Sequence, residues 1–281
     1  AHEVTTFRRD VETDGRHAVV AFSTDVAEDA ARRDFTMNAL YATADGAVID
    51  PLGGLPDLTA GRVRFVGDPA ARITEDYLRI LRFFRFHAVY GDPAQGIDAE
   101  GLAACAAHAD GIAGLSKERI GAEMRKLLAA ADPAPALASM AQAGVLAQTL
   151  PGADPSAIAP LVHLEPPLAP RWQRRLAALT GQDPTDSLRL SRADSADFSK
   201  VRAEIGSTQT PAALGYALGE VLAQDVVLCR AVLLEMPLPP NWQAEILRGA
   251  TAQCPVKAAQ LMPALQGAAL GARLRAIESA W

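Results

Sequence analysis

Asp76 and Arg79 are the residues in this sequence whose types and spacing best suit recognition of a nucleobase. At 3.6 residues per turn, a spacing of three places two side chains on adjoining strips of one helix. A carboxylate there can accept a hydrogen bond from the amino group of cytosine or adenine, and a guanidinium can donate one to the ring nitrogen beside it. Guanine and uracil present a carbonyl beside an N–H, which would leave both protein groups unpaired. The pair therefore predicts a site that admits C and A and rejects G and U.

The run that contains this pair predicts one helix beginning at Thr74. Thr74 is a suitable N-cap, and Glu75 in the first turn suits the positive end of the helix dipole. Arg79 and Arg82 share the polar face, and the apolar face is formed by Tyr77, Ile80, Leu81, Phe84 and Ala88. The alternative to a base-reading site is an ordinary solvated face with an ion pair between residues i and i+3, worth about 0.2–0.5 kcal/mol.

Arg85 departs from this division because it points toward the apolar side of the same helix. An unpaired charge is costly there. The side chain is therefore expected either to extend to solvent or to meet a buried partner, and a nucleotide phosphate is one candidate partner.

Sequence motifs on both sides of this helix resemble those of a known family. Upstream lie RRDFTMNAL (32–40), DPLGGLPDL (50–58) and RFVGDP (64–69), and downstream lies LSKERIGAEMRKLL (115–128). In this order and spacing they closely resemble the class II tRNA nucleotidyltransferases, which include the bacterial CCA-adding enzymes and their poly(A) polymerase relatives. Residues 254–281 are similar to the C-terminal helical portion of the same bacterial enzymes, except that Gln260 stands where an acidic residue is expected.

The resemblance implies roles for individual residues. Asp76 and Arg79 would read the base. Asp34 would support the sugar or order its loop, and the ribose or triphosphate of the incoming nucleotide would be contacted by Arg33, Arg82 and Arg85. The motif at 115–128 would brace the reading helix rather than touch substrate, through Glu118, Arg119 and Glu123.

Magnesium is the cofactor that the resemblance implies. Family members hold two Mg²⁺ ions on an Asp-x-Asp pair, which activates the attacking 3′-hydroxyl and stabilises the pyrophosphate leaving group. This sequence contains no Asp-x-Asp motif and begins with Ala1, so we expect a fragment that recognises but does not itself catalyse, and we assign no catalytic residue. Glu3, on a predicted strand, is the remaining candidate metal ligand or support for one; an outward-facing strand residue is the alternative.

Composition favours a soluble protein of a reducing compartment, and we predict a cytoplasmic location. No apolar run approaches the length of a membrane span, so no membrane partner is expected. The three cysteines are widely spaced without a Cys-x-x-Cys, which argues against a zinc site or a disulfide framework. The five histidines show no metal-ligand spacing. The sequence gives no indication of the oligomeric state.

A formal net charge of −6 is unusual for a partner of RNA, because nucleic-acid binding usually leaves a basic surface. The charge is uneven, since six arginines fall within residues 62–85 and three more within 171–175. Local basic surfaces of this kind can bind phosphate while the whole protein stays acidic. A solvated helix face is the alternative for the second group, which is Arg171, Arg174 and Arg175.

The expected fold is α+β and predominantly α. The N-terminal part is expected to contain strands at 2–9 and 17–22, an interrupted helix at 25–42, and a hairpin-like turn at Gly53 and Gly54 flanked by 48–50 and 63–66. Alanine-rich helices are expected at 98–109, 116–131 and 133–149, followed by a proline-rich linker at 151–170.

These elements suggest three domains. The first would be the C-terminal part of a nucleotidyltransferase β-sheet head (1–67). A helical neck for nucleotide recognition (68–150) and a helical body and tail for tRNA binding (151–281) would follow.

The predicted function is template-independent addition of CTP and then ATP to the 3′ end of tRNA, with the Asp/Arg pair as a protein template. The expected partners are a tRNA or other RNA 3′ end, ATP and CTP. A poly(A) polymerase or A-adding enzyme of the same family stays open, because that distinction depends on loop flexibility and on head residues that this sequence lacks. A non-catalytic RNA-binding helical module is a further alternative.

Overall fold

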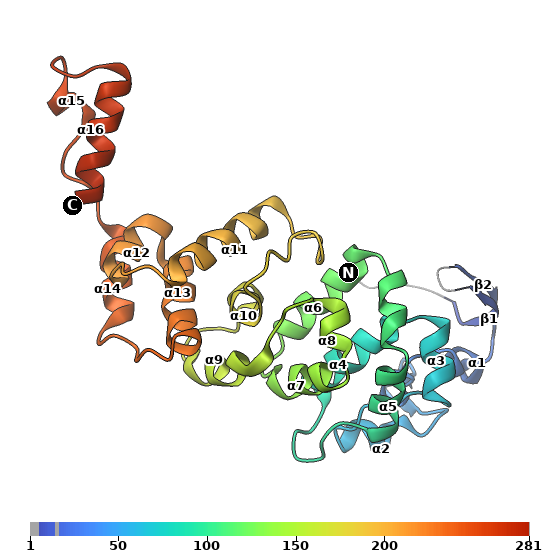
Figure 1. The fold of residues 1–281 in the computed structure, drawn as a ribbon. Coiled ribbons are helices and arrows are strands. Elements are labelled where there is room, and N and C mark those ends of the chain that lie inside the picture. The colour runs from blue at the N-terminus through green and yellow to red at the C-terminus, as the bar shows by residue number, and fades with distance from the viewer. Residues whose placement is uncertain (1–5, 15–16, 281) are drawn as a thin grey trace.

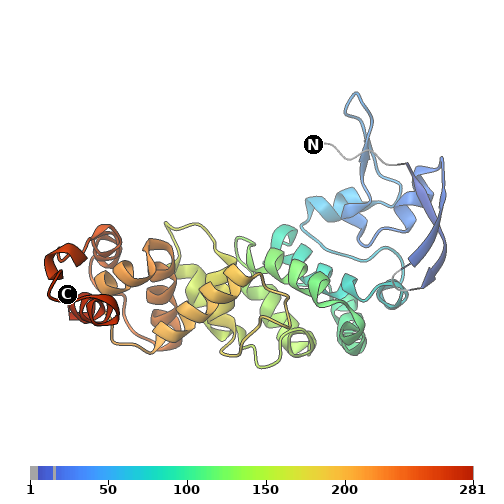
Figure 2. The same ribbon diagram turned by 90° about the horizontal axis from the view of Figure 1, so that it is seen from above.

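The molecule is elongated, and its elements follow chain order along the long axis. The computed structural model describes residues 6–14 and 17–280 (Figure 1). The N-terminal strands lie at one end and α16 (Gly267–Ala280) lies at the other (Figure 2). The fold is α+β and predominantly α, which confirms the prediction from the sequence.

Two small antiparallel hairpins and three short helices make up the N-terminal part. The first hairpin sets Arg8 opposite Phe22, and the second sets Tyr41 opposite Ile49. The elements are β1 (Arg8–Asp14), β2 (His17–Phe22), α1 (Val26–Ala31), η1 (Thr36–Asn38), β3 (Tyr41–Ala42), β4 (Val48–Ile49) and α2 (Gly54–Thr59).

Two of the predictions for this part are confirmed. The strand expected at 17–22 is present, and the helix expected at 25–42 is interrupted, although its last two residues are β3. The strand expected at 2–9 instead begins at Arg8, and residues 1–5 lie outside the described part of the chain.

The prediction of a hairpin-like turn at Gly53 and Gly54 is wrong, because these two glycines lie at the start of helix α2. β4 pairs with β3, and the Asp50 carboxylate accepts hydrogen bonds from the backbone N–H groups of Gly54 (2.7 Å) and Leu55 (2.9 Å) at the start of α2. Gly53 has φ +69°, and a Cβ on Gly54 would lie 2.0 Å from the carbonyl oxygen of Thr36. The glycine pair thus allows a left-handed residue and a close approach of α2 to η1.

The remainder of the chain is helical. Its elements are α3 (Pro69–Glu75), α4 (Leu78–Tyr90), α5 (Ala99–Ala107), η2 (Ala109–Gly114), α6 (Lys117–Leu128), α7 (Ala134–Gln142), α8 (Val145–Thr149), η3 (Pro155–Ala157), α9 (Ile158–Leu164), α10 (Trp172–Leu179), α11 (Arg192–Ile205), α12 (Pro211–Leu218), α13 (Glu220–Leu233), α14 (Trp242–Thr251), α15 (Ala258–Leu261) and α16. The region expected to be a linker, 151–170, therefore contains η3 and α9, and Ile158 and Leu161 of α9 are fully buried.

An aromatic cluster joins the N-terminal part to α4. Phe35 packs against Phe65 (ring centroids 5.0 Å apart) and against Phe86 (4.9 Å), and Phe65 stacks on Phe83 (5.4 Å). Phe35, Phe65 and Phe83 are almost completely buried. Aromatic side chains bury large apolar areas, so this cluster fixes α4 against the segments that precede it.

Candidate nucleotide-recognition site

Asp76 lies at a break between two helices, α3 and α4, and not in the first turn of a single helix beginning at Thr74, as the sequence predicted. Asp68 caps α3 by accepting from the Ala71 N–H (2.7 Å), with Pro69 at the first helical position. Thr74 lies inside α3, where its hydroxyl donates to the Ala71 carbonyl (2.9 Å). Asp76 is extended (φ −156°, ψ 105°) and ends α3.

Asp76 then serves as a capping group for the next helix. Its Oδ1 accepts from the Leu78 N–H (3.1 Å), and its Oδ2 pairs with Arg119 Nη2 of α6 at 2.6 Å. The side chain is therefore held by a helix start on one side and by a second helix on the other. A carboxylate offers about four lone-pair positions, so two stay available for a ligand.

Arg79 is held by Glu75 rather than by Asp76. Its guanidinium pairs with the Glu75 carboxylate, and it donates to the carbonyl oxygens of Arg72 (2.7 Å) and Arg32 (3.3 Å). The Arg79 backbone N–H donates to the Asp76 carbonyl (3.0 Å), but within the described residues the two side chains do not pair with each other. The i,i+3 ion pair that was the alternative to a base-reading site is therefore absent from this part of the chain. The two side chains still leave the same turn of the α3–α4 junction.

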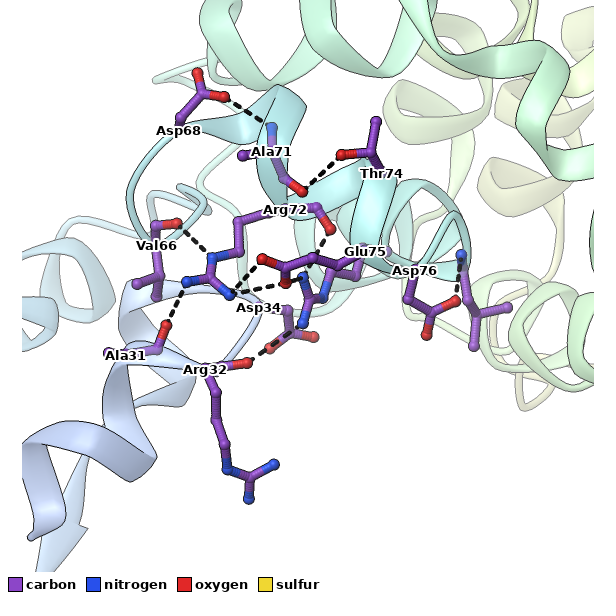
Figure 3. A network of polar contacts seen from close by, with 12 residues as sticks. Ala31, Arg32, Asp34, Val66, Asp68, Ala71, Arg72, Thr74, Glu75 and Asp76 are labelled. Atoms are coloured by element: carbon purple, nitrogen blue, oxygen red, sulfur yellow. Dashed lines mark hydrogen bonds and ion pairs between the residues drawn. The ribbon is translucent and has the colours of Figure 1, made fainter. Parts of the chain in front are cut away.

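A network centred on Glu75 ties this junction to the N-terminal part (Figure 3). Arg72 pairs with Glu75 at 2.8 Å and donates to the carbonyl oxygens of Val66 (3.2 Å) and Ala31 (2.7 Å). Because Arg79 reaches the carbonyl of Arg32, two arginines from α3 and α4 hold the main chain that follows α1. The sequence motif did not reveal Arg72 and Glu75 as site residues, although their i,i+3 spacing was a signal for an ion pair.

Arg82 and Asp34 form a second connection between α4 and the N-terminal part. They lie 2.5 Å apart, and Asp34 also accepts from the Asn38 amide (2.8 Å) and from the Phe35 N–H (3.0 Å). Asp34 is buried, whereas 28% of the Arg82 side chain is exposed. Asp34 thus orders its own loop and presents Arg82 at the surface.

Arg33 lies beside this connection and is held by Asp29. Asp29 is buried and accepts from Arg33 (2.9 Å), Arg32 (2.9 Å) and the Tyr41 hydroxyl (2.7 Å). Burial by itself raises the pKa of Asp29, but the hydrogen bonds from Tyr41, Arg33 and Arg32 outweigh it and hold that pKa well below its usual range. Asp29 therefore stays ionised and orients Arg33, whose side chain is 36% exposed.

Arg85 meets a buried partner, which is one of the two outcomes expected for it. Its Nε lies 2.5 Å from Oε2 of Glu123 on α6, and its guanidinium stacks over the Phe86 ring (4.5 Å to the centroid). Glu123 is only 5% exposed. Together with the bond from Arg119 to Asp76, this pair shows that α6 braces α4, whereas Glu118 pairs with Arg189 at 3.1 Å.

The second arginine group, on α10, is neither a phosphate-binding surface nor a solvated face. Arg174 pairs with Asp225 (2.8 Å) and Glu165 (3.1 Å), and Arg175 pairs with Glu165 (2.7 Å). Arg174 and Arg175 are almost fully buried, and Arg171 is 18% exposed and pairs with Asp225 at 3.3 Å. Both alternatives offered by the sequence are wrong because a buried charge needs a buried counter-charge, and Glu165 and Asp225 supply it.

Comparisons with known proteins support the resemblance found in the sequence. Residues 1–64 match the family model of the Poly A polymerase head domain, and residues 96–156 match that of the probable RNA and SrmB-binding site of polymerase A. The chain is 51% identical over 126 residues to the Homo sapiens protein CCA tRNA nucleotidyltransferase 1, mitochondrial, a match that covers 45% of this chain and 29% of the human protein. Among solved structures, the Bacillus stearothermophilus CCA-adding enzyme in complex with CTP is similar with a TM-score of 0.74 and 27% identity, covering 98% of this chain and 73% of that chain. Over the matched regions, the chain is similar in sequence and fold to the CCA-adding enzymes and poly(A) polymerases.

Two further similar proteins show how much of a relative the chain spans. The CCA-adding enzyme of Geobacillus thermodenitrificans is 42% identical over 154 residues, which are 54% of this chain and 37% of that enzyme. The chain thus spans less than two-fifths of the length of the two curated relatives. The Thermotoga maritima CCA-adding enzyme complexed with tRNA_CCA shares the fold, with a TM-score of 0.62 and 17% identity over 90% of this chain and 68% of that one.

The described residues do not provide a site for the Mg²⁺ that this family resemblance implies. Within residues 6–14 and 17–280, no group of three or more histidine, cysteine, aspartate or glutamate side chains is arranged to hold a metal ion. Glu3, the candidate ligand from the sequence, lies outside the described residues. The described carboxylates of the recognition site are instead paired with arginines.

Proposed function

We propose that this chain is the nucleotide-selecting and RNA-binding part of a CCA-adding tRNA nucleotidyltransferase. The observation that carries the proposal is the α3–α4 break, which sets Asp76 and Arg79 on one turn between the N-terminal part and α6. The similarity to a CCA-adding enzyme in complex with CTP agrees with a nucleotide site in this fold.

Base selection would rest on the hydrogen-bonding capacity that these two residues retain. Asp76 Oδ1 and Oδ2 each use one lone pair, and Arg79 uses its Nη1 and one N–H of Nη2 for partners within the described residues. The carboxylate would accept from the amino group of cytosine or adenine, and the guanidinium would donate to the adjacent ring nitrogen. Uracil and guanine would set like groups against each other and leave them unsatisfied.

The arginines near the surface would bind the charged part of the nucleotide. Arg33 and Arg82 are partly exposed and each is oriented by a buried aspartate, so we propose them as contacts to the ribose or triphosphate. Asp34 would act by ordering Arg82 and its loop. Arg85 is engaged by Glu123, so we propose that it supports α4 in this position and contacts nucleotide only by leaving that partner.

We propose that the reaction also requires Mg²⁺, which would assist attack by the RNA 3′-hydroxyl and departure of pyrophosphate. The metal ligands, Glu3 among them, would lie outside the residues described here. Residues 1–281 alone, which contain no Asp-x-Asp pair, are expected not to extend tRNA. We retain as proposals the domain limits 1–67, 68–150 and 151–281, with the last as the main tRNA-binding region.

A cytoplasmic location is likewise proposed. None of the described helices combines the length and apolar character needed to cross a bilayer. One of the similar proteins is named as mitochondrial, and fractionation of cells that express the full-length protein tests the proposed location.

A poly(A) polymerase is the second candidate, because both matching family models carry that name. The test is to incubate the full-length protein with Mg²⁺, labelled CTP or ATP, and either tRNA lacking its CCA end or an unrelated RNA. Addition of C, C and A to tRNA supports the proposal. A run of A residues on either RNA supports the poly(A) alternative, and RNA binding without extension supports a non-catalytic module.

A further inference from the structure

The helix that braces the recognition site is itself held by a distant segment of the chain. Residues 184–190, which we call the strap, lie between α10 and α11 and pack along α6. A Cβ on Gly121 of α6 would lie 2.0 Å from the carbonyl oxygen of Leu188, and Leu188 is almost fully buried. The main chain of the strap therefore touches the main chain of α6 at a point where only glycine fits.

Polar contacts extend this attachment along α6. Arg125 donates to the carbonyl oxygen of Arg189 (3.0 Å), and Arg189 pairs with Glu118 at 3.1 Å. Lys117 at the start of α6 pairs with Asp186 of the strap. Each pair at this surface is weak on its own, but together with the glycine contact they define one register of the strap on the helix.

The end of α6 is fixed by the buried arginine of α10. Arg175 donates to the carbonyl oxygens of Leu128 (2.7 Å) and Ala131 (3.0 Å) and to that of Ala130. Leu128 is the last residue of α6, and its carbonyl is one that the end of a helix leaves without an intrahelical partner, whereas Ala130 and Ala131 belong to the segment that follows. Because Arg175 is itself held by Glu165, α6 cannot slide along its axis without breaking the buried hydrogen bonds that Arg175 donates to these carbonyls.

The strap and the recognition site use opposite faces of α6. At about 100° per residue, Gly121 and Arg125 lie within roughly 80° of Lys117 around the helix axis. Arg119 and Glu123, which hold Asp76 and Arg85, lie at about 200° and 240° on the same scale. A displacement of α6 by the strap is therefore transmitted directly to the side chain that holds Asp76.

We infer that the strap and Gly121 are positioning elements for nucleotide selection: they set the rotation of α6 and, through Arg119, the place of the Asp76 carboxylate. The inference rests on the proposed function for its consequence in nucleotide choice. Its mechanical part, that α6 position controls the α3–α4 junction, does not depend on the reaction.

The mechanical part is tested by hydrogen–deuterium exchange of the full-length protein. Gly121→Ala forces α6 and Leu188 apart, so exchange of the backbone amides in residues 76–80 should increase several-fold while α13 is unchanged. Gly206→Ala is the matched control, because Gly206 has a right-handed helical backbone and no atom within 4 Å of an added Cβ. Unchanged exchange at 76–80 in a folded Gly121→Ala protein overturns the inference, whatever the protein catalyses.

The functional part is tested with tRNA lacking its CCA end and a double-mutant cycle. Gly121→Ala and Arg119→Ala should each lower the ratio of kcat/KM for CTP over UTP by about tenfold. If the strap acts through Arg119, the CTP/UTP ratio of kcat/KM in the double variant should be no lower than in Arg119→Ala alone. A ratio in the double variant that is about a hundredfold below the wild-type ratio would mean independent effects and overturns the inference. If the wild-type protein shows no preference for CTP and ATP, the proposed function fails instead, and the exchange experiment still decides the mechanical part.

Arg125→Ala provides a second variant in case Gly121→Ala does not fold. It removes the hydrogen bond to Arg189 without inserting an atom between α6 and the strap. The same changes in exchange and in the CTP/UTP ratio are expected, at a smaller size. A variant with wild-type thermal stability, exchange at 76–80 and nucleotide discrimination contradicts the role of the strap.

Discussion

Two arginine groups that look alike in the sequence have opposite roles in the structure. In the group within residues 62–85, Arg82 is partly exposed and is oriented by the buried Asp34, and the neighbouring Arg33 is held in the same way by the buried Asp29. On α10, Arg174 and Arg175 are buried, and their guanidinium groups are shared among Glu165, Asp225 and main-chain carbonyls. The first arrangement leaves donors facing solvent for an anionic ligand, and the second uses its donors to join α6, α9, α10 and α13.

The difference follows from where the counter-charges come from. In the α4 region, Asp29 lies four residues before Arg33 and Asp34 lies on a segment next to Arg82. Each carboxylate holds one edge of its arginine, so the other edge stays accessible. Around α10 the carboxylates come from α13 and the end of α9, and Arg174 and Arg175 are covered almost completely. Arginine clusters therefore indicate anion binding only when the packing of the surrounding helices leaves them accessible.

Removal of Arg175 should give the largest effect, and it should be on stability. Arg175→Ala would remove one of the two arginines that hold the buried Glu165, and it would leave the carbonyl group of Leu128 at the end of α6 without this partner. We expect the free energy of unfolding to fall by about 3–5 kcal/mol, measured by denaturant unfolding. Arg62→Ala, at a side chain that is 53% exposed, is the control and should change it by less than about 1 kcal/mol. Equal, small effects of both changes would remove the distinction between the two groups.

Replacement of Asp76 should change nucleotide selection in addition to removing the cap of α4. In the full-length protein, Asp76→Ala removes the acceptor proposed for the amino group of C and A. The activation barrier for addition of CTP and of ATP should rise by about 1–3 kcal/mol. The ratio of kcat/KM for these two nucleotides over that for UTP and GTP should fall. Glu100→Ala, an exposed carboxylate on α5, is the control.

Wild-type rates and discrimination in Asp76→Ala would show that this side chain only caps α4 and pairs with Arg119. A general loss of fold would instead reduce the rates for all four nucleotides together and lower the melting temperature. The two outcomes are separated by measuring thermal unfolding of the same samples.

RNA binding distinguishes the two groups through its dependence on salt. If exposed arginines hold RNA phosphates, the logarithm of the affinity should fall against the logarithm of salt concentration by roughly 0.7–0.9 per phosphate neutralised. Arg62→Gln should reduce this slope by about one such step. Arg171→Gln should leave it unchanged, because Arg171 is directed to Asp225 and Asp197. An affinity that does not depend on salt would remove the tRNA-binding role from this chain.

The sequence predicted the helical fold and the motif residues better than it predicted their partners. Asp76 and Arg79 were placed together by a spacing of three, but the stronger helix-start signal was Asp68 followed by Pro69, which begins α3 and leaves Asp76 at a break. The sequence predicted that Arg85 could meet a buried partner. It did not identify Glu123 as that partner, because this contact depends on how α6 packs on α4. Contacts between segments far apart in the sequence, such as Gly121 with Leu188, have no local signal at all.

The smallest predicted effect compares two buried aspartates, one from each region. Burial raises the pKa of Asp225 by more than Arg174 and Arg171 lower it, whereas the hydrogen bonds to Asp29 outweigh burial and lower its pKa. A lowered folded-state pKa stabilises the fold above the unfolded pKa, and that contribution is lost as the pH falls through the folded value. A raised pKa has the opposite sign, since its contribution is present below the unfolded pKa and is lost as the pH rises.

The stability advantage of the wild type over Asp29→Asn should therefore grow between about pH 3 and about pH 7, and its advantage over Asp225→Asn should shrink over the same range. Denaturant unfolding of the three proteins at several pH values measures both trends. Because both substitutions replace a carboxylate by a neutral side chain of nearly the same shape, they differ chiefly in the surrounding arginines and burial. If the stability difference between the wild type and each variant changes with pH in the same direction for both, Asp225 is also held as a stable anion. The two regions would then differ in exposure but not in the electrostatics of their aspartates.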